Sequence, residues 1–217
     1  MAIIAPSLLS ADFLHLAADC EMLNRSSADW YHLDVMDGHF VPNISFGPMI
    51  VQFIRSATTK YCDVHLMIEQ PEKYAEAFKK AGADNLTVHI ETCKDLNANL
   101  DQIKQLGMHA GIAINPDTPV ESLRPYLSKA DVICMMSVYP GFGGQPFIEG
   151  TYERIKLLRQ MINEAGVSAK IEIDGGVTLE NASNIVASGA DVLVAGNTVF
   201  KSHDPLQTIE QLKSFER

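Results

Sequence analysis

The sequence predicts an α/β fold in which eight strand–helix units close into a (β/α)8 barrel, the TIM barrel architecture. Three observations support this prediction: short apolar runs recur along the chain, helical patterns separate them, and a glycine repeatedly stands between a helix and the next run. Strands that alternate with helices are typical of a parallel sheet covered by helices. The 217 residues allow about 27 residues per unit, which is short for this architecture.

Eight apolar runs are the strand candidates. Most are rich in Val and Ile and nearly continuous, as expected for strands that are buried on both faces. In chain order they are Ile3–Ala5, Tyr31–Val35, Cys62–Met67, Asn85–His89, Ala110–Ile114, Val132–Met136, Ala169–Ile173 and Val192–Ala195.

Apolar residues at helical spacing lie between these runs. Ser10 stands where it could cap the first helix, whose apolar positions are Phe13, Leu16, Ala17, Cys20 and Leu23. Two further helical sets are Leu96, Leu100 and Ile103, and Ile155, Leu158 and Ile162. The left-handed residue that ends a helix is commonly glycine, and the candidates for this position are Gly82, Gly107, Gly166 and Gly189.

The alternative fold is an open doubly wound sheet. When such a sheet binds a dinucleotide, a glycine-rich turn follows its first strand. The turn here reads PSLLSADF, residues 6–13, and contains no glycine. We therefore expect the barrel, as a single domain over residues 1–217, because no linker or low-complexity tract interrupts the pattern.

Composition narrows the classes of function. The net charge of −10 argues against a nucleic-acid partner, but backbone N–H groups could still hold a small phosphorylated ligand. The four cysteines are far apart and form no Cys-x-x-Cys, which indicates reduced thiols. The N-terminus lacks the features of a signal peptide, and no apolar stretch is long enough to span a membrane. We expect a cytoplasmic protein.

Chemistry in such barrels sits at the carboxyl ends of the strands. His32 and Asp34 end the second predicted strand, His65 lies near the end of the third, and Asp174 ends the seventh. A single histidine there would more often be a hydrogen-bonded core residue, but four such groups together would need a compensating cation. Imidazole and carboxylate ligands suit zinc, iron(II), manganese or cobalt. The sequence therefore predicts a metal site.

Other residues at the same end of the barrel have less specific interpretations. Met36, Met67 and Met136 are either ordinary core residues or a dry wall around a reactive centre. His89 and Glu91 could form an outer pair behind the ligands and are not counted as ligands. We expect solvated side chains for His15, His109 and His203, and we assign His39 no role.

Glycine-rich turns follow the last three predicted strands. They read PGFGGQ (140–145), DGG (174–176) and AGN (195–197). The loops after the seventh and eighth strands are the usual phosphate site of this fold. Glycine lets backbone N–H groups approach phosphate oxygens closely, so these turns indicate a phosphate-binding end.

Eight stretches resemble the ribulose-phosphate 3-epimerase family and together span almost the whole chain. They are APSLLSADF (5–13), YHLDVMDGHFVPNISFGP (31–48), DVHLMI (63–68), HIE (89–91), INPDTP (114–119), MMSVYPGFGGQPFI (135–148), IEIDGGV (171–177) and VAGNTVF (194–200). The resemblance implies an isomerase with one divalent metal ion per chain. It also implies that this enzyme converts D-ribulose 5-phosphate to D-xylulose 5-phosphate at C3 through an enediolate, a step of the pentose phosphate pathway. Family members form homo-oligomers, as dimers or hexamers.

The resemblance also implies roles for individual residues. The metal ligands would be His32, Asp34, His65 and Asp174, with Asp34 and Asp174 as the acid/base pair. The residues expected to contact substrate are Ser7, His65, Gly141, Phe142, Gly143, Gly144, Asp174, Gly175, Gly176, Gly196 and Asn197. Two residues depart from the family pattern: Asn197 replaces a common Ser, and Tyr139 stands where Glu, Asn or Asp is common.

Three other functions remain open at this stage. The first is a 3-epimerase of a hexulose phosphate such as D-allulose 6-phosphate, which would use the same ligands. The second is a Schiff-base aldolase, which needs a lysine at a strand end, whereas Lys60, Lys80, Lys129 and Lys170 precede strands. The third is a non-catalytic phosphosugar-binding barrel.

Overall fold

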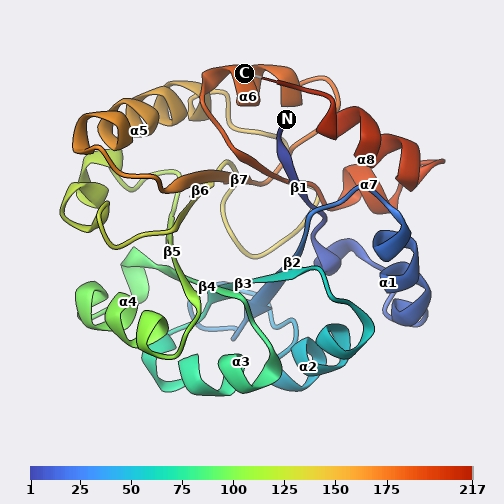
Figure 1. Ribbon diagram of the computed structural model, residues 1–217, viewed down its shortest axis with the longest axis horizontal. Helices are drawn as coiled ribbons and strands as arrows, with labels where there is room; N and C mark the ends of the chain where they lie inside the picture. The colour runs from blue at the N-terminus through green and yellow to red at the C-terminus, as the bar shows by residue number, and fades with distance from the viewer. Residues whose placement is uncertain (217) are drawn as a thin grey trace.

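The computed structural model describes residues 1–216 and shows a ring of eight parallel strands surrounded by helices (Figure 1). Neighbouring strands pair in sequence order from β2 to β8, and β8 pairs with β1. The strands are β1 (Ile3–Ala5), β2 (Trp30–Met36), β3 (Tyr61–Met67), β4 (Asn85–His89), β5 (His109–Ile114), β6 (Val132–Met136), β7 (Lys170–Asp174) and β8 (Val192–Val194). The eight predicted strands are confirmed, most of them to within one residue at each end.

The ring closes between β1 and β2. Ser7 and His32 form an isolated parallel bridge, and His32 N–H donates to Pro6 O at 3.1 Å. Asp29 N–H donates to Ile4 O at 2.9 Å on the same seam. The chain ends also meet, because Ala2 N–H donates to Phe215 O at 3.2 Å. The predicted barrel, rather than the open sheet, is therefore confirmed.

Eight α-helices lie among the described residues. They are α1 (Leu16–Arg25), α2 (Pro48–Ala57), α3 (Ala75–Ala81), α4 (Leu96–Gln105), α5 (Thr151–Ala165), α6 (Ala182–Ser188), α7 (Asn197–Phe200) and α8 (Pro205–Lys213). Short 3-10 segments are η1 (Leu8–Ser10), η2 (Pro71–Lys73), η3 (Ile90–Thr92) and η4 (Val120–Tyr126), and η4 replaces an α-helix between β5 and β6. No helix within residues 1–216 is long and apolar enough to cross a membrane.

The predicted helix ends are confirmed at the glycines. Gly82, Gly107, Gly166 and Gly189 all have positive φ and follow α3, α4, α5 and α6. The prediction for the start of the first helix is wrong. Ser10 ends η1 and caps no α-helix, and Phe13 lies outside α1. The reason is a turn at Asp12, whose Oδ1 accepts from Leu14 N–H at 2.9 Å and so delays the helix.

The strands have two differently filled faces. On β2, Tyr31, Leu33 and Val35 join the apolar core between the strands and the helices. The alternate residues, among them His32 and Asp34, point into the barrel. Apolar side chains fill part of the interior, around Ala5 of β1, Val132 of β6, and Val192 and Val194 of β8. Buried polar side chains also lie there, namely His32, Asp34, Asp63, His65, Asn85, Thr87, His89 and Glu172.

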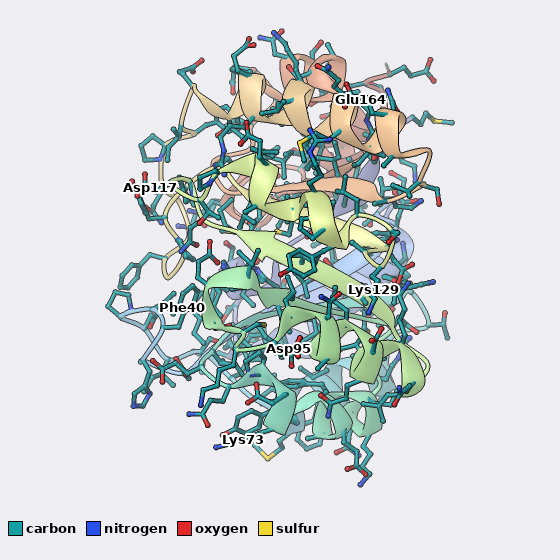
Figure 2. The ribbon with its side chains drawn as sticks, turned by 90° about the vertical axis from the view of Figure 1, so that its left-hand side faces the viewer. Phe40, Lys73, Asp95, Asp117, Lys129 and Glu164 are labelled. Atoms are coloured by element: carbon teal, nitrogen blue, oxygen red, sulfur yellow. The ribbon has the colours of Figure 1, made fainter. Side chains whose placement is uncertain are left out.

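The two ends of the barrel face opposite directions. Figure 2 shows Phe40 and Asp117, which follow β2 and β5, at one end, and Lys129, which precedes β6, at the other. Polar residues that end strands therefore gather at the Phe40–Asp117 end.

Candidate active site

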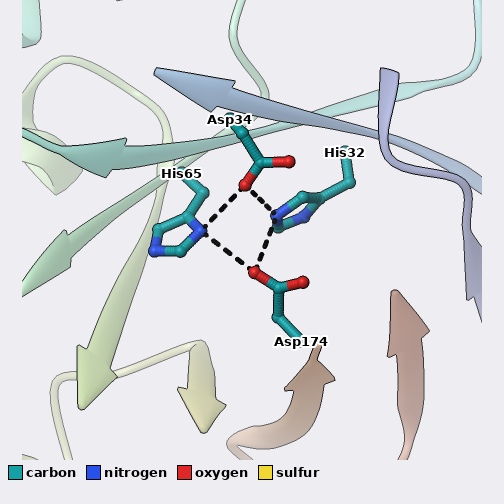
Figure 3. Close-up of side chains that lie close together, drawn as sticks. All are labelled: His32, Asp34, His65 and Asp174. Carbon is teal, nitrogen blue, oxygen red and sulfur yellow. Dashed lines mark hydrogen bonds and ion pairs between the residues drawn. The ribbon is translucent and has the colours of Figure 1, made fainter. Parts of the chain in front are cut away.

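Four side chains from three strands meet at the carboxyl end of the barrel (Figure 3). His32 and Asp34 are two residues apart on β2, so they face the same side. Parallel pairing places Asp34 opposite His65 of β3. Asp174 ends β7 and approaches from across the ring. The four residues predicted as ligands are thus brought together.

The ligand atoms of these residues outline a small space. Asp34 Oδ1 lies 3.2 Å from His32 Nε2 and 3.3 Å from His65 Nδ1. Asp174 Oδ2 lies 3.7 Å from His32 Nε2 and 3.5 Å from His65 Nδ1. Ligand atoms about 2.0–2.2 Å from a tetrahedral cation are roughly 3.3–3.6 Å apart. The spacing therefore fits one small divalent cation.

Burial and charge favour a cation at the same place. His32 and His65 are fully buried, and His32 Nε2 makes no hydrogen bond within residues 1–216. Burial lowers the pKa of His32, but the charges of Asp34 and Asp63 outweigh it and raise this pKa well above its ordinary value. Burial raises the pKa of Asp34, but His32 and His65 outweigh it and lower this pKa. The acids thus draw positive charge into the cluster, which a metal ion can supply.

The Asp63 carboxylate binds the ring nitrogen of His32 that faces away from the cluster. His32 Nδ1 lies 2.7 Å from Asp63 Oδ2, and Asn85 Nδ2 donates to Asp63 Oδ1 at 2.6 Å. A carboxylate on the second ring nitrogen fixes the tautomer of a ligating histidine. This partner leaves Nε2 as the nitrogen that carries a lone pair toward the cluster.

Glu172 lies in the same buried layer, and neither of its carboxyl oxygens has a hydrogen-bond partner among the described residues. Burial and the neighbouring Asp63 raise the pKa of Glu172 well above its ordinary value, which favours the protonated form. Sequence reasoning missed Asp63, Asn85 and Glu172 because it considered only strand ends. The signal was present as polar residues at alternate positions, in DVH (63–65), NLT (85–87) and EID (172–174).

Ser7, which was expected to contact substrate, and His89, which was expected in an outer pair, both contact the cluster. Ser7 Oγ donates to Asp34 Oδ2 at 2.5 Å and so fixes the carboxylate oxygen that does not face the histidines. His89 Nε2 lies 2.9 Å from His65 Nε2, and His89 Nδ1 lies 3.1 Å from Glu91 Oε2. The predicted outer pair of His89 and Glu91 therefore lies directly behind His65.

A cavity of about 620 Å3 opens above the cluster. The predicted catalytic, substrate and wall residues that line it are Ser7, Asp34, Met36, Met67, Met136, Gly141, Phe142, Gly143, Gly144, Asp174, Gly175, Gly176, Gly196 and Asn197. His32 and His65 are fully buried and are not part of this lining, so a contact between His65 and substrate stays a prediction. No lysine is among the described residues of the lining, which leaves the Schiff-base alternative without its nucleophile.

The loop between β6 and α5 packs tightly over this cavity. A Cβ on Gly176 would lie 2.5 Å from Phe147 N, and a Cβ on Gly144 would lie 2.4 Å from Asn197 Nδ2. Close packing alone therefore accounts for glycine at these two positions of the glycine-rich turns. Tyr139 Oη donates to Asp117 at 2.9 Å, which ties the start of this loop to the turn after β5.

The remaining histidines lie away from the cluster. His15, His109 and His203 are exposed, as predicted, and His39 is exposed in the loop after β2. His109 begins β5 and bonds to Tyr61 Oη at 2.6 Å, at the opposite end of the barrel.

The fold and the cluster define the class of this protein: a (β/α)8-barrel enzyme with buried imidazole and carboxylate groups at its catalytic end. A family model described as "Ribulose-phosphate 3 epimerase family" matches residues 3–200. The chain belongs to this family, and the predicted resemblance is confirmed.

Individual relatives agree with this assignment. A ribulose-phosphate 3-epimerase of Synechocystis sp. is 46% identical over 217 residues, covering 99% of this chain and 94% of the relative. One from Bacillus subtilis is 44% identical over 211 residues, covering 97% of each. Among solved structures, KGPDC from Streptococcus mutans matches with a TM-score of 0.73 at 13% identity, over 98% of this chain and 96% of that one, and supports the fold alone.

Proposed function

We propose that this chain is a metal-dependent epimerase that inverts C3 of D-ribulose 5-phosphate to give D-xylulose 5-phosphate, a step of the pentose phosphate pathway. The observation that carries the proposal is the cluster of His32, Asp34, His65 and Asp174, whose ligand atoms all lie within 4.8 Å of one another. Family membership supports the reaction.

The four clustered residues would hold one divalent cation, through His32 Nε2, His65 Nδ1, Asp34 Oδ1 and Asp174 Oδ2. When bound, such a cation supplies Lewis-acid stabilisation for negative charge on the ketose oxygens. Zinc, iron(II), manganese and cobalt all accept imidazole and carboxylate ligands.

Asp34 and Asp174 would move the protons. Epimerisation beside a ketone removes a proton from one face of the carbon and returns one to the other face, through a planar enediolate. The two carboxyl groups lie on β2 and β7, on opposite sides of the cluster, and both line the cavity. One would be ionised and the other protonated at the start, and their roles would exchange in the reverse reaction. Ser7 would orient Asp34 through the bond to Oδ2.

The phosphate group would bind at the other end of the cavity, where Gly143, Gly144, Gly176, Gly196 and Asn197 lie. Backbone N–H groups suit an anion, and this chain has a net charge of −10 with no lysine or arginine among the described lining residues. The loop of residues 139–147 would keep water from the enediolate while the phosphate is held. Met36, Met67 and Met136 would form a dry wall.

The experiment that tests the metal proposal measures metal content and activity together. The full chain is purified without added metal, and divalent ions are counted per chain by mass spectrometry. We expect about one ion per chain, epimerisation of ribulose 5-phosphate that chelation abolishes, and slower turnover of allulose 6-phosphate.

His32→Ala should lose the ion. His109→Ala is the matched control, because His109 lies at the opposite end of the barrel, and it should keep the ion. Full activity in protein without a divalent ion would contradict the metal proposal.

We also propose a single domain over residues 1–217 and a cytoplasmic homo-oligomer. The uninterrupted barrel supports the first. Exposed apolar side chains of Phe13, Leu14, Ile44, Met49 and Phe53 support self-association, and light scattering that gives the mass of one chain would contradict it.

A further inference from the structure

A hydrogen-bonded path leads outward from His65. Its Nε2 lies 2.9 Å from His89 Nε2, and the two rings stack with centroids 5.0 Å apart. His89 Nδ1 lies 3.1 Å from Glu91 Oε2. His89 is fully buried, with the Phe40 ring 4.7 Å away, so it has no access to water.

The outer end of this path is firmly anchored. Glu91 Oε1 accepts from Asn115 N–H at 2.8 Å and from the Thr118 hydroxyl. Burial raises the pKa of Glu91, but the bonds from His89, Asn115 and Thr118 outweigh it and lower the pKa to about 2. Glu91 is therefore a fixed acceptor.

A fixed acceptor at one end determines the direction of every bond in the path. Glu91 can only accept, so His89 carries its proton on Nδ1 and presents a lone pair at Nε2. A neutral His65 must then donate from Nε2, which leaves its lone pair on Nδ1. That nitrogen is the one that lies 3.3 Å from Asp34 Oδ1 and 3.5 Å from Asp174 Oδ2.

The two histidines of the cluster thus differ in the partner that binds the ring nitrogen facing away from the cluster. His32 faces the cluster with Nε2, and Asp63 accepts from Nδ1 directly. His65 faces the cluster with the opposite nitrogen, and a second imidazole stands between it and its carboxylate. The spacer must be neutral, because a doubly protonated His89 would have no lone pair at Nε2 to accept from His65.

We propose that His89 and Glu91 are positioning residues, which fix the tautomer and the ring orientation of His65 so that Nδ1 is available as a ligand. The inference rests on the proposed metal site. Outer partners of ligating histidines typically change metal affinity by about 10–100-fold when they are removed.

The test measures zinc affinity of the full chain by equilibrium competition with a chromophoric chelator. His89→Phe fills the site but leaves His65 Nε2–H without an acceptor, and we expect it to weaken zinc binding by about 10–100-fold. His89→Gln offers a carboxamide oxygen to the same N–H and should recover most of that loss. Glu91→Gln removes the charge at the anchored end and should weaken binding by about tenfold.

Two further measurements separate positioning from packing. Glu76→Gln is the matched control, since Glu76 is exposed and pairs with Lys80 on the outside of the barrel, and it should bind zinc like the parent chain. Nitrogen-15 shifts of His65 in the zinc-loaded chain should show zinc on Nδ1 and the proton on Nε2 in the parent, and a mixture of the two arrangements in Glu91→Gln. The Glu91 side chain is partly exposed, so we expect Glu91→Gln to fold. Glu91→Gln therefore still tests the inference if His89→Phe does not fold.

The outcomes are distinct. If the parent binds one zinc and the His89→Phe and Glu91→Gln variants bind it equally well, the inference is wrong and the metal proposal stands. Equal losses in His89→Phe and His89→Gln would also overturn it, because packing alone would then explain them. If the parent binds no zinc, the metal proposal fails and the inference fails with it.

Discussion

Three of the four groups in the cluster are held by a partner outside it. Ser7 holds Asp34, Asp63 holds His32, and His89 holds His65. The ligands could be predicted from the sequence because they are polar residues at strand ends, where this fold places its chemistry. Asp63 and Glu172 were not predicted, because each lies two residues before the polar residue considered at the end of its strand, His65 or Asp174. Their partners are set by strand register, which a single sequence does not state.

The cysteines give a prediction at this scale. Burial raises the pKa of Cys20 to about 11 and is the main cause that raises those of Cys62 and Cys93 to about 12. A raised pKa keeps a thiol protonated near pH 8, and the protonated thiol is a poor nucleophile. A chromogenic disulfide reagent should therefore react slowly with the folded chain and quickly with the unfolded chain. Four rapid equivalents from folded protein would contradict the burial of these residues.

Individual elements follow the sequence pattern where one residue type determines them. The strands and the glycine helix ends were predicted, because apolar runs and left-handed residues are local signals. The start of α1 was predicted wrongly, because the turn at Asp12 competes with the helix. The 3-10 segment η4 carries Pro125 within it and was not foreseen.

Contact between β4 and β5 gives a prediction for an element. A Cβ on Gly111 would lie 2.0 Å from Thr87 Oγ1 and 3.0 Å from Thr87 Cα. Gly111→Ala should therefore lower the free energy of unfolding by about 1–3 kcal/mol, through overpacking of the barrel interior. Gly150→Ala is the control, because nothing lies within 4 Å of its Cβ position, and it should change stability by less than about 1 kcal/mol. Denaturant unfolding measures the free energy of unfolding of Gly111→Ala and Gly150→Ala. Equal values for the two variants would contradict the overpacking between β4 and β5.

The fold of the whole molecule depends on closure of the ring of eight strands. The seam between β1 and β2 has few hydrogen bonds, yet it brings Ser7 beside His32 and so completes the cluster. The sequence predicted a barrel from the number of units and the alternation of elements. It could not predict the polar interior, which depends on how side chains from β2, β3, β4 and β7 meet inside the barrel.

Unfolding tests the proposed single domain. Trp30, the only tryptophan, stacks on Tyr61 with ring centroids 4.6 Å apart at the amino ends of β2 and β3. Its fluorescence reports that end of the barrel, far-UV circular dichroism reports the helices, and activity reports the other end. We expect the three transitions in denaturant to coincide. Well-separated transitions would contradict a single cooperative domain.

The most direct test of the account measures exchange of the C3 proton for deuterium. Ribulose 5-phosphate and xylulose 5-phosphate are incubated separately in D2O with the parent chain, Asp34→Asn or Asp174→Asn, each supplied with the divalent ion, and followed by NMR. We predict that the parent exchanges and epimerises both sugars. Each variant should lose epimerisation by about 10²–10⁴-fold and keep exchange in at most one sugar, a different one for each variant. Epimerisation near the parent rate by either variant would contradict the assignment of the two acids.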